Sequence, residues 1–499
     1  MSRINTNVQS LIGQRVLGQN NSTLNTSLER LSTGLRINRG KDDPAGLIAS
    51  ENLRSEKASI SAAIGNAERA DQVVNIAEGG LQEINSLLIE VQSLVGQSAN
   101  EAGLSDDEKK ANQLQIDSIL QTIDRIAAST SFQGTKLLNG TYDFTTSGVD
   151  AQVADFNING AKLAFGENRD VEVLVTQSAQ RGSLFLSVGA NRGLASATSA
   201  FTFELGGSLG TREFTFGSGT SVDEIAASIN TFSDVTGISA VASGVYVELK
   251  SEEFGSDEFV NFRVTNLGGL TGGVGTNSTV GEDVLGATAA FTATTDIRDA
   301  GQDVGAVING VTAVADGKTA RINTDFLDVE LELTTTGSQT LGSVGGANPA
   351  LTITGGGARF NLGPNVDILN QVSLGIGNVA ARNLGSLSTG YLDQLGSSKG
   401  NNVVDGDLGG AQNIVNEAIN QVSTLRGRLG AFQKNIVGAT IRSLGVALEN
   451  TSAAESAIRD TDFAEETAAL TRAQILVQSS TQILSIANSQ PQNALALLG

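Results

Sequence analysis

The chain has 499 residues and a formal net charge of −21, and it contains no cysteine, no histidine and no tryptophan. These absences exclude disulfides, thiolate chemistry, histidine-based catalytic triads and histidine-ligated zinc. The acidic balance argues against a nucleic-acid partner, and no apolar run approaches the ~18 residues of a membrane-spanning helix, so membrane insertion is not expected.

The first 40 residues have the periodicity of an amphipathic helix. Apolar side chains recur at steps of three and four, which is typical of a coiled-coil stripe. The positions between them are filled mainly by Asn, Gln, Ser and Thr rather than by charged residues. The stripe consists of Ile4, Val8, Leu11, Leu24, Leu28, Leu31 and Leu35.

Two further helices are predicted before residue 134. The second begins after a turn, with Asp43 as the candidate N-cap and Pro44 at the first helical position. Ser105 and Glu108 have the spacing of a capping box, so a third helix is expected to begin there and to end before Gly134.

The carboxyl end mirrors this pattern. One apolar stripe begins at Ile414 and continues from Val437 one position out of register. Pro491 and Gly499 are expected to mark the end of the last helix. The stripe of that last helix contains Leu470, Ala473, Val477, Leu484 and Ala487, and Ser480 interrupts it.

Both ends of the chain have a composition that suits burial between helices. The segment from Ala473 to Gly499 has no charged residue and is rich in Gln and Asn. Amides can hydrogen-bond across helices, and no ion has to be desolvated. Such helices are marginal in isolation, so we expect both ends to become ordered by packing against other copies of the chain.

The middle of the chain is acidic and predicted to be rich in strands. Residues 141–390 hold 12 basic and 27 acidic residues, which is −15 of the net charge of −21. Short runs that alternate apolar and polar residues are separated by Gly, Ser, Asn and Asp, as in FTFEL, VYVEL and VELEL. One helix is predicted over residues 221–232, so the fold class is α+β and multidomain.

No motif in the chain predicts catalysis, a cofactor or a metal site. The glycine-rich stretches lack the lysine of a phosphate-binding loop and are interpreted as turns. Asp405 and Asp407 have only part of the ligand spacing of a calcium loop, so a turn before a helix is the better interpretation. Neighbouring carboxylates such as Asp106 and Asp107 are interpreted as solvated surface rather than an acid/base couple.

Several long motifs at both ends make the chain resemble bacterial flagellin, the subunit of the flagellar filament. The amino-terminal motifs are INTN, LERLSTGLRINRGKDDPAGL, QSAN and IDRIAASTSFQGTKLLNG. The carboxyl-terminal motifs are LRGRLGAFQKN, ESAIRDTDFAEE, QILVQSS and ANSQPQNALALL. A shorter resemblance to the flagellin IN motif is carried by EIAASIN and GVYVELKSEEFGS.

The resemblance implies long terminal helices paired as an antiparallel coiled coil, with a β-rich region inserted between them. Residues 1–44 and 455–499 would form an inner polymerisation domain, in which the apolar stripes are the interface. Residues 45–175 and 400–454 would form a helical rod domain with a β-hairpin. Residues 176–399 would form the outer variable region, with an IN-motif-like module at about 196–268 and a second β module at about 285–365.

The resemblance also implies partners and a location. Copies of the chain would form a helical polymer outside the cell, after secretion by the flagellar export apparatus with the help of a flagellin chaperone. The filament cap and the hook–filament junction proteins would be further partners. No cofactor, nucleic acid or membrane insertion is implied.

A receptor-recognition surface of the family is altered in this sequence. Flagellins that activate Toll-like receptor 5 resemble Gln-Arg-Val-Arg-Glu-Leu in the second helix, where this chain has Ile-Glu-Val-Gln-Ser-Leu. Leu94 is kept, but Glu90 reverses a charge, and Gln115 stands where the family has a glutamate. Weak or absent receptor activation is therefore predicted.

Two alternatives stay open at this point. A hook–filament junction protein shares similar ends but forms only a short collar. An adhesin would use the β-rich middle to bind glycans, alone or as part of a filament. An enzymatic function is opposed by the lack of histidine.

Overall fold

A computed structural model of the chain describes residues 6–100, 103–164, 166–188, 194, 200–270, 272–277, 285–290 and 296–496. The chain divides into two compact units. The first consists of Met1–Asp71, Asn361–Asn370 and Phe432–Gly499, and the second of Gln72–Phe360 and Gln371–Ala431.

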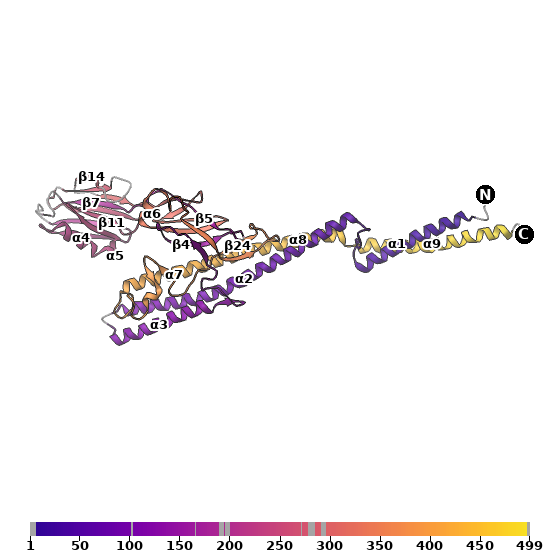
Figure 1. Cartoon of the computed structure of the whole chain (residues 1–499), viewed down its shortest axis with the longest axis horizontal. Coiled ribbons are helices and arrows are strands. Elements are labelled where there is room, and N and C mark those ends of the chain that lie inside the picture. The colour runs from indigo at the N-terminus through magenta and orange to yellow at the C-terminus, as the bar shows by residue number, and fades with distance from the viewer. Residues whose placement is uncertain are drawn as a thin grey trace. The chain divides into compact units, whose positions relative to one another are not determined.

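The long helices lie at both ends of the sequence, and strands fill the middle, as predicted (Figure 1). The helices are α1 (Val8–Thr33), α2 (Pro44–Ser98), α3 (Asp106–Ser129), α4 (Val222–Asn230), α5 (Ser233–Thr236), α6 (Thr335–Gln339), α7 (Leu408–Ala431), α8 (Gly438–Arg459) and α9 (Phe463–Ala496), with a 3₁₀ turn at Leu392–Leu395 and a π-helical turn at Phe432–Val437. None of the described helices is long and apolar enough to cross a membrane.

Local hydrogen bonds explain why the first three helices begin where they do. Asn7 caps α1 by accepting a bond from the backbone N–H of Ser10. Asp43 accepts one from the N–H of Gly46 at the start of α2. Ser105 and Glu108 form the predicted capping box of α3, with the Glu108 carboxylate accepting from the N–H of Ser105 at 2.8 Å.

The change of register in the carboxyl-terminal stripe has a structural cause. The π-helical turn Phe432–Val437 lies between α7 and α8, and both of its end residues are buried. A π-turn adds one residue to the helical repeat and therefore shifts the apolar positions by one. The prediction that the stripe changes register at Val437 is thus explained.

Of the two residues predicted to mark the end of the last helix, Pro491 does not end it, because α9 continues to Ala496, and Gly499 lies outside the described residues. A proline has no N–H to donate to the carbonyl four residues earlier, which here belongs to Ala487. The side-chain amide of Asn7 donates to that carbonyl at 2.8 Å. A residue from the other end of the chain thus satisfies the acceptor that the proline leaves free.

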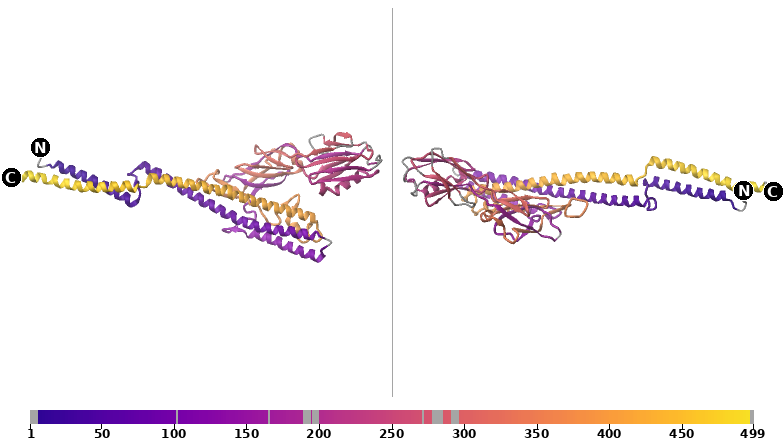
Figure 2. Two further views of the ribbon diagram at one scale, coloured as in Figure 1. Left: turned by 180° about the vertical axis from the view of Figure 1, so that it is seen from behind. Right: turned by 90° about the horizontal axis from the view of Figure 1, so that it is seen from above.

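In the second unit, α2, α3 and α7 lie side by side and have buried apolar faces (Figures 1 and 2). The Gln113 amide of α3 is buried and donates to the carbonyl of Leu395, while its oxygen accepts from the N–H of Val403. The buried residues of α2 and α3 include Leu81, Ile84, Leu88, Val91, Val95, Ile116 and Ile123, and those of α7 include Ile414, Ala418, Val422 and Leu429.

The strands are short and mostly antiparallel. They are β1 (Ser131–Phe132), β2 (Thr135–Lys136), β3 (Phe144–Ser147), β4 (Val153–Ala161), β5 (Arg169–Val171), β6 (Val173–Gln177), β7 (Ser183–Ser187), β8 (Phe201–Gly206), β9 (Thr211–Phe216), β10 (Ile238–Ser243), β11 (Tyr246–Ser251), β12 (Phe259–Asn266), β13 (Gly273–Asn277), β14 (Leu285–Ala290), β15 (Asp296–Ala300), β16 (Gly305–Ile308), β17 (Val311–Thr312), β18 (Val314–Asp316), β19 (Thr319–Asn323), β20 (Leu327–Leu333), β21 (Gly342–Ser343), β22 (Leu351–Gly356), β23 (Ala358–Asn361), β24 (Gln371–Leu374), β25 (Gly385–Ser386) and β26 (Gly390–Tyr391).

These strands form two modules, each with its own hydrophobic core. The first β module contains the sheets β17-β16-β6-β21, β18-β19-β20-β4 and β3-β22-β5. Its core joins residues from Phe144 to Ala179 with residues from Val304 to Ile353. It is therefore built mainly from two separate stretches of sequence.

The second β module contains the sheets β10-β11-β7-β13-β14 and β15-β12-β8-β9. Its core includes four phenylalanines around Phe203, whose ring centroid lies 4.7 Å from that of Phe262. Helix α4 is capped by Ser221 and Glu224 and buries its apolar side in the same core. The predicted helical insert among strands is thus confirmed.

Candidate assembly interface

Helices α1 and α9 lie side by side and antiparallel in the first unit (Figure 1). The Asn20 amide of α1 donates to the Ser480 hydroxyl of α9 at 2.7 Å. The Ser10 hydroxyl donates to the side-chain oxygen of Asn488, also at 2.7 Å. At the other end of the pair, Arg30 lies 3.6 Å from the Glu466 carboxylate. These contacts are polar and widely spaced.

The faces by which the two helices meet carry small residues. The buried residues of α1 are Ser10, Gly13 and Ser27, and those of α9 include Ala473, Ser480 and Ala487. At Gly13, an added Cβ would lie 3.3 Å from the Leu484 side chain, so the helices approach closely there. Small residues bury little apolar area, and the pair gains correspondingly little hydrophobic stabilisation within one chain.

Ten large apolar residues of the pair point outward. They are between 38% and 61% exposed, and they are Val8, Leu11, Ile12, Val16 and Leu28 of α1 and Phe463, Ile475, Leu476, Ile483 and Ile486 of α9. Exposed apolar surface of this extent marks an interaction site in a soluble chain.

The predicted interface residues fall on two different faces. Val8, Leu11 and Leu28 are exposed. Leu24, Leu31, Leu470, Val477 and Leu484 are half-buried within the helix pair. Leu35 lies beyond the end of α1 and forms an antiparallel bridge with Asp460. Ile4 lies outside the described residues.

Sequence reasoning missed the outward isoleucines of α9 and the small contact residues Ser10, Gly13 and Ser27 of α1. A signal for the contact residues of α9 was present, because Ala473, Ser480 and Ala487 recur at intervals of seven. Ser480, which interrupts the apolar stripe, is the residue that accepts the hydrogen bond from Asn20. Ile483 and Ile486 stand outside the stripe that was followed, so their exposure required the structure.

The receptor-like surface lies on α2 and α3 in the second unit. Glu90 and Gln115 are exposed. Leu94 is only 6% exposed, because it belongs to the buried face of α2. Leu94 therefore contributes to the helical core rather than to the surface, and the altered charge at Glu90 is what an approaching partner would meet.

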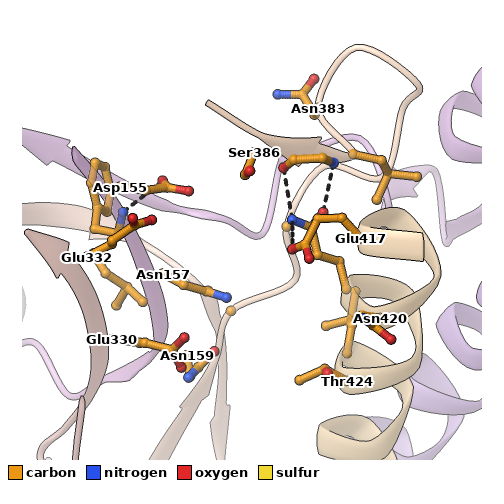
Figure 3. A pocket seen from close by; sticks show the side chains of 18 of the residues that line it. Asp155, Asn157, Asn159, Glu330, Glu332, Asn383, Ser386, Glu417, Asn420 and Thr424 are labelled. Carbon is orange, nitrogen blue, oxygen red and sulfur yellow. Dashed lines mark hydrogen bonds between the residues drawn. The ribbon is translucent and has the colours of Figure 1, made fainter. Parts of the chain in front are cut away.

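The second unit also contains a polar cavity of about 600 Å³ (Figure 3). Asp155 and Glu332 lie on its strand wall, and Glu417 and Asn420 lie on its α7 wall. Burial raises the pKa of Asp155, the N–H of Phe156 opposes this shift, and the nearby Glu332 carboxylate adds to it. Two of its carboxylates have a cation nearby: Glu332 lies 3.2 Å from Lys318, and Glu330 lies 4.0 Å from Arg321. Among the described residues no cluster suited to a metal ion occurs.

Comparison with known proteins gives matches along the whole chain. The family model of the bacterial flagellin N-terminal helical region matches residues 4–143, that of the flagellin C-terminal helical region matches residues 412–498, and that of the flagellin hook IN motif matches residues 200–251. Together these matches cover more than half of the sequence.

Full-length relatives agree with these matches. Polar flagellin B/D of Vibrio parahaemolyticus is 27% identical over 99% of both chains, and the flagellin of Salmonella typhimurium is 29% identical over 99% of both. Among solved structures, FliC from Burkholderia pseudomallei aligns with 73% of this chain and 99% of its own, at 14% identity and a TM-score of 0.23.

Proposed function

Because the chain belongs to the bacterial flagellin family and is a structural subunit of the flagellar filament used for motility, we propose that the α1–α9 pair is the element through which its copies polymerise. The observation that carries this proposal is the outward apolar surface of both helices. A filament subunit is favoured over a junction protein or an adhesin, because the relatives that match the full length are flagellins.

The energetics of the pair favour coupled folding and assembly. Burying one large aliphatic side chain contributes about 1.5–3 kcal/mol. The apolar residues that are fully buried within one chain are small and several leucines stay half-buried, so neighbouring copies supply the burial that the exposed apolar residues lack. Helices that are marginal alone then become ordered as they bind, and contacts that repeat without closing produce a helical polymer.

We assign different roles to the predicted interface residues. Val8, Leu11 and Leu28 contact neighbouring copies, since they are exposed in the single chain. Leu35 holds the chain at the end of α1, where the N–H of Arg36 donates to the carbonyl of Arg459 at 2.7 Å. Leu24, Leu31, Leu470, Val477 and Leu484 line the helix pair and set its spacing.

The remaining assignments follow from membership of the family. Residues 1–44 and 455–499 form the polymerisation domain, and residues 176–399 form the outer variable region. The subunit is secreted through the flagellar export apparatus with a chaperone, and it assembles beneath the filament cap onto the junction proteins. It performs no catalysis, a proposal supported by the absence of histidine and cysteine from the sequence.

Seeded polymerisation followed by negative-stain electron microscopy tests the interface. The full-length chain forms long filaments, and a chain lacking residues 1–40 and 455–499 forms none. A double variant, Ile475→Gln with Ile483→Gln, raises the critical concentration at least about ten-fold, because two exposed apolar contacts are lost.

The matched control is Gln478→Ala with Gln482→Ala, which changes two exposed polar positions of the same helix. The control is expected to polymerise like the unsubstituted chain. Equal critical concentrations for the isoleucine variant and the control would contradict the proposed interface.

We also propose that the subunit activates Toll-like receptor 5 weakly or not at all, since Glu90 presents a negative charge where activating relatives have arginine. Reporter cells that express the receptor, treated with endotoxin-free monomer, measure this. Strong signalling at low concentration would contradict it.

A further inference from the structure

The junction between the two β modules is built from contacts at three separate places. The chain crosses it twice, at residues 178–182 and 300–304. The two crossings pair as an antiparallel bridge, in which the N–H of Gln180 donates to the carbonyl of Gln302 at 2.8 Å and the reverse bond is 2.9 Å. A paired ribbon of this kind can still bend, and modules joined only by such a ribbon move relative to each other by default.

A third contact comes from the loop between β11 and β12 of the second β module. The Phe254 side chain of this loop is 6% exposed and belongs to the hydrophobic core of the first β module. The Arg181 guanidinium lies 4.5 Å from the centroid of its ring, and the Lys318 ammonium lies 5.8 Å from it. A side chain of one module is therefore buried in the other and flanked by two cations.

Asp303 fastens the same loop to a turn of the first β module. Its carboxylate accepts bonds from the N–H of Ser256 at 2.9 Å, the Ser256 hydroxyl at 2.6 Å and the N–H of Gly317 at 2.9 Å. Burial would raise the pKa of Asp303, but these bonds outweigh burial and lower it. The ionised carboxylate is thus the form that the junction favours.

Glycines allow the backbones to meet closely. A Cβ at Gly301 would lie 2.4 Å from the carbonyl oxygen of Gly255, and a Cβ at Gly317 would lie 2.6 Å from that of Phe254. Gly317 also has a φ of +57°. Backbone contact of this kind leaves no room for a larger residue and no side chain that could adjust to a change of angle.

We propose that Phe254 and Asp303 hold the two β modules together as one rigid body, with no hinge between them. These two residues fix the orientation of the second module on the first. A force applied to one module then moves both modules together, because no hinge lies between them.

Distance measurements between two spin labels test the proposal. The chain contains no cysteine, so Val241→Cys and Val314→Cys introduce the only reactive thiols. Both positions are exposed, at 54% and 80%, and they lie on edge strands of different modules. Pulsed electron–electron double resonance on the labelled full-length monomer then gives the distribution of the distance between the two labels, one on each module.

We expect a single narrow distribution in the otherwise unsubstituted chain. Asp303→Ala and, separately, Phe254→Ala broaden it at least about two-fold, and Asp303→Asn broadens it less, since an amide oxygen still accepts hydrogen bonds. The matched control is Asp257→Asn, an exposed carboxylate in the same loop, which leaves the width unchanged.

Two results would overturn the proposal. A broad distribution in the unsubstituted chain would show that the modules are jointed. A narrow distribution in both Asp303→Ala and Phe254→Ala would show that other contacts hold them. Circular dichroism of each variant establishes that the modules remain folded, and polymerisation is a separate measurement whose failure leaves this result unaffected.

Discussion

The α1–α9 pair and the second β module use their apolar residues in opposite ways. The β module turns its phenylalanines inward, and Phe201, Phe203 and Phe262 are fully buried. The helix pair turns its isoleucines outward and buries alanine, serine and glycine between its helices. One region completes its core within a single chain, and the other leaves large apolar residues exposed that we propose other copies cover.

This difference has a consequence for stability. A module with its own core is expected to fold in the monomer and to unfold independently of assembly. A helix pair without one is expected to gain its stability with polymerisation, and its stability will depend on the concentration of subunits. Substitutions should therefore separate into those that affect the module and those that affect the filament.

The largest effect on the β module without an effect on the filament is expected from Phe203→Ala. The ring of Phe203 lies within 6 Å of four other phenylalanine rings, at distances from 4.7 to 5.9 Å. Its loss should destabilise the second β module by about 3–5 kcal/mol, because a large cavity remains. Thermal unfolding followed by circular dichroism measures this, while the critical concentration for polymerisation stays unchanged.

The control for Phe203→Ala is Glu213→Gln on the exposed side of β9. Its stability should match that of the unsubstituted chain. If Phe203→Ala also prevented polymerisation, the two regions would not be independent, and the comparison would fail.

Asn20→Ala is expected to have a smaller effect, and on polymerisation rather than on the stability of the β modules. The variant loses the hydrogen bond to Ser480 at 2.7 Å, which contributes about 1 kcal/mol. The critical concentration should rise several-fold, with no change in the unfolding of the β modules. Asn21→Ala, at the exposed neighbouring position, is the control; equal behaviour of the two variants would remove the assigned role of Asn20.

The smallest effect is expected from Asp155→Asn in the first β module. A carboxyl group whose pKa is raised in the folded state binds its proton more tightly there, so stability falls as pH rises above about 3.8 through the folded pKa. The variant should be more stable near neutral pH by less than about 1 kcal/mol, since the group is partly exposed.

This advantage of Asp155→Asn should disappear below about pH 3.8, where the carboxyl group is protonated in both states. Unfolding curves at several pH values, with Asp316→Asn as the exposed control in the same module, measure the difference. A variant that is less stable at neutral pH would reverse the assigned sign.

The sequence by itself determined those features that depend on residues close together in the chain. The capping boxes at Ser105 and Ser221 and the alternating strands could be predicted, because their hydrogen bonds and periodicity are local. The change of register at Val437 was visible in the same way, and the family motifs indicated the filament.

Only the tertiary structure decided which face each terminal helix turns toward its partner. Leu24 and Leu28 belong to one sequence stripe, yet Leu24 is half-buried in the pair and Leu28 is exposed. The continuation of α9 past Pro491 likewise involves Asn7 from the far end of the chain, which donates a hydrogen bond to the carbonyl of Ala487. The junction of the β modules depends on Phe254 and Asp303 in the same way, because contacts between residues far apart in sequence leave no local pattern.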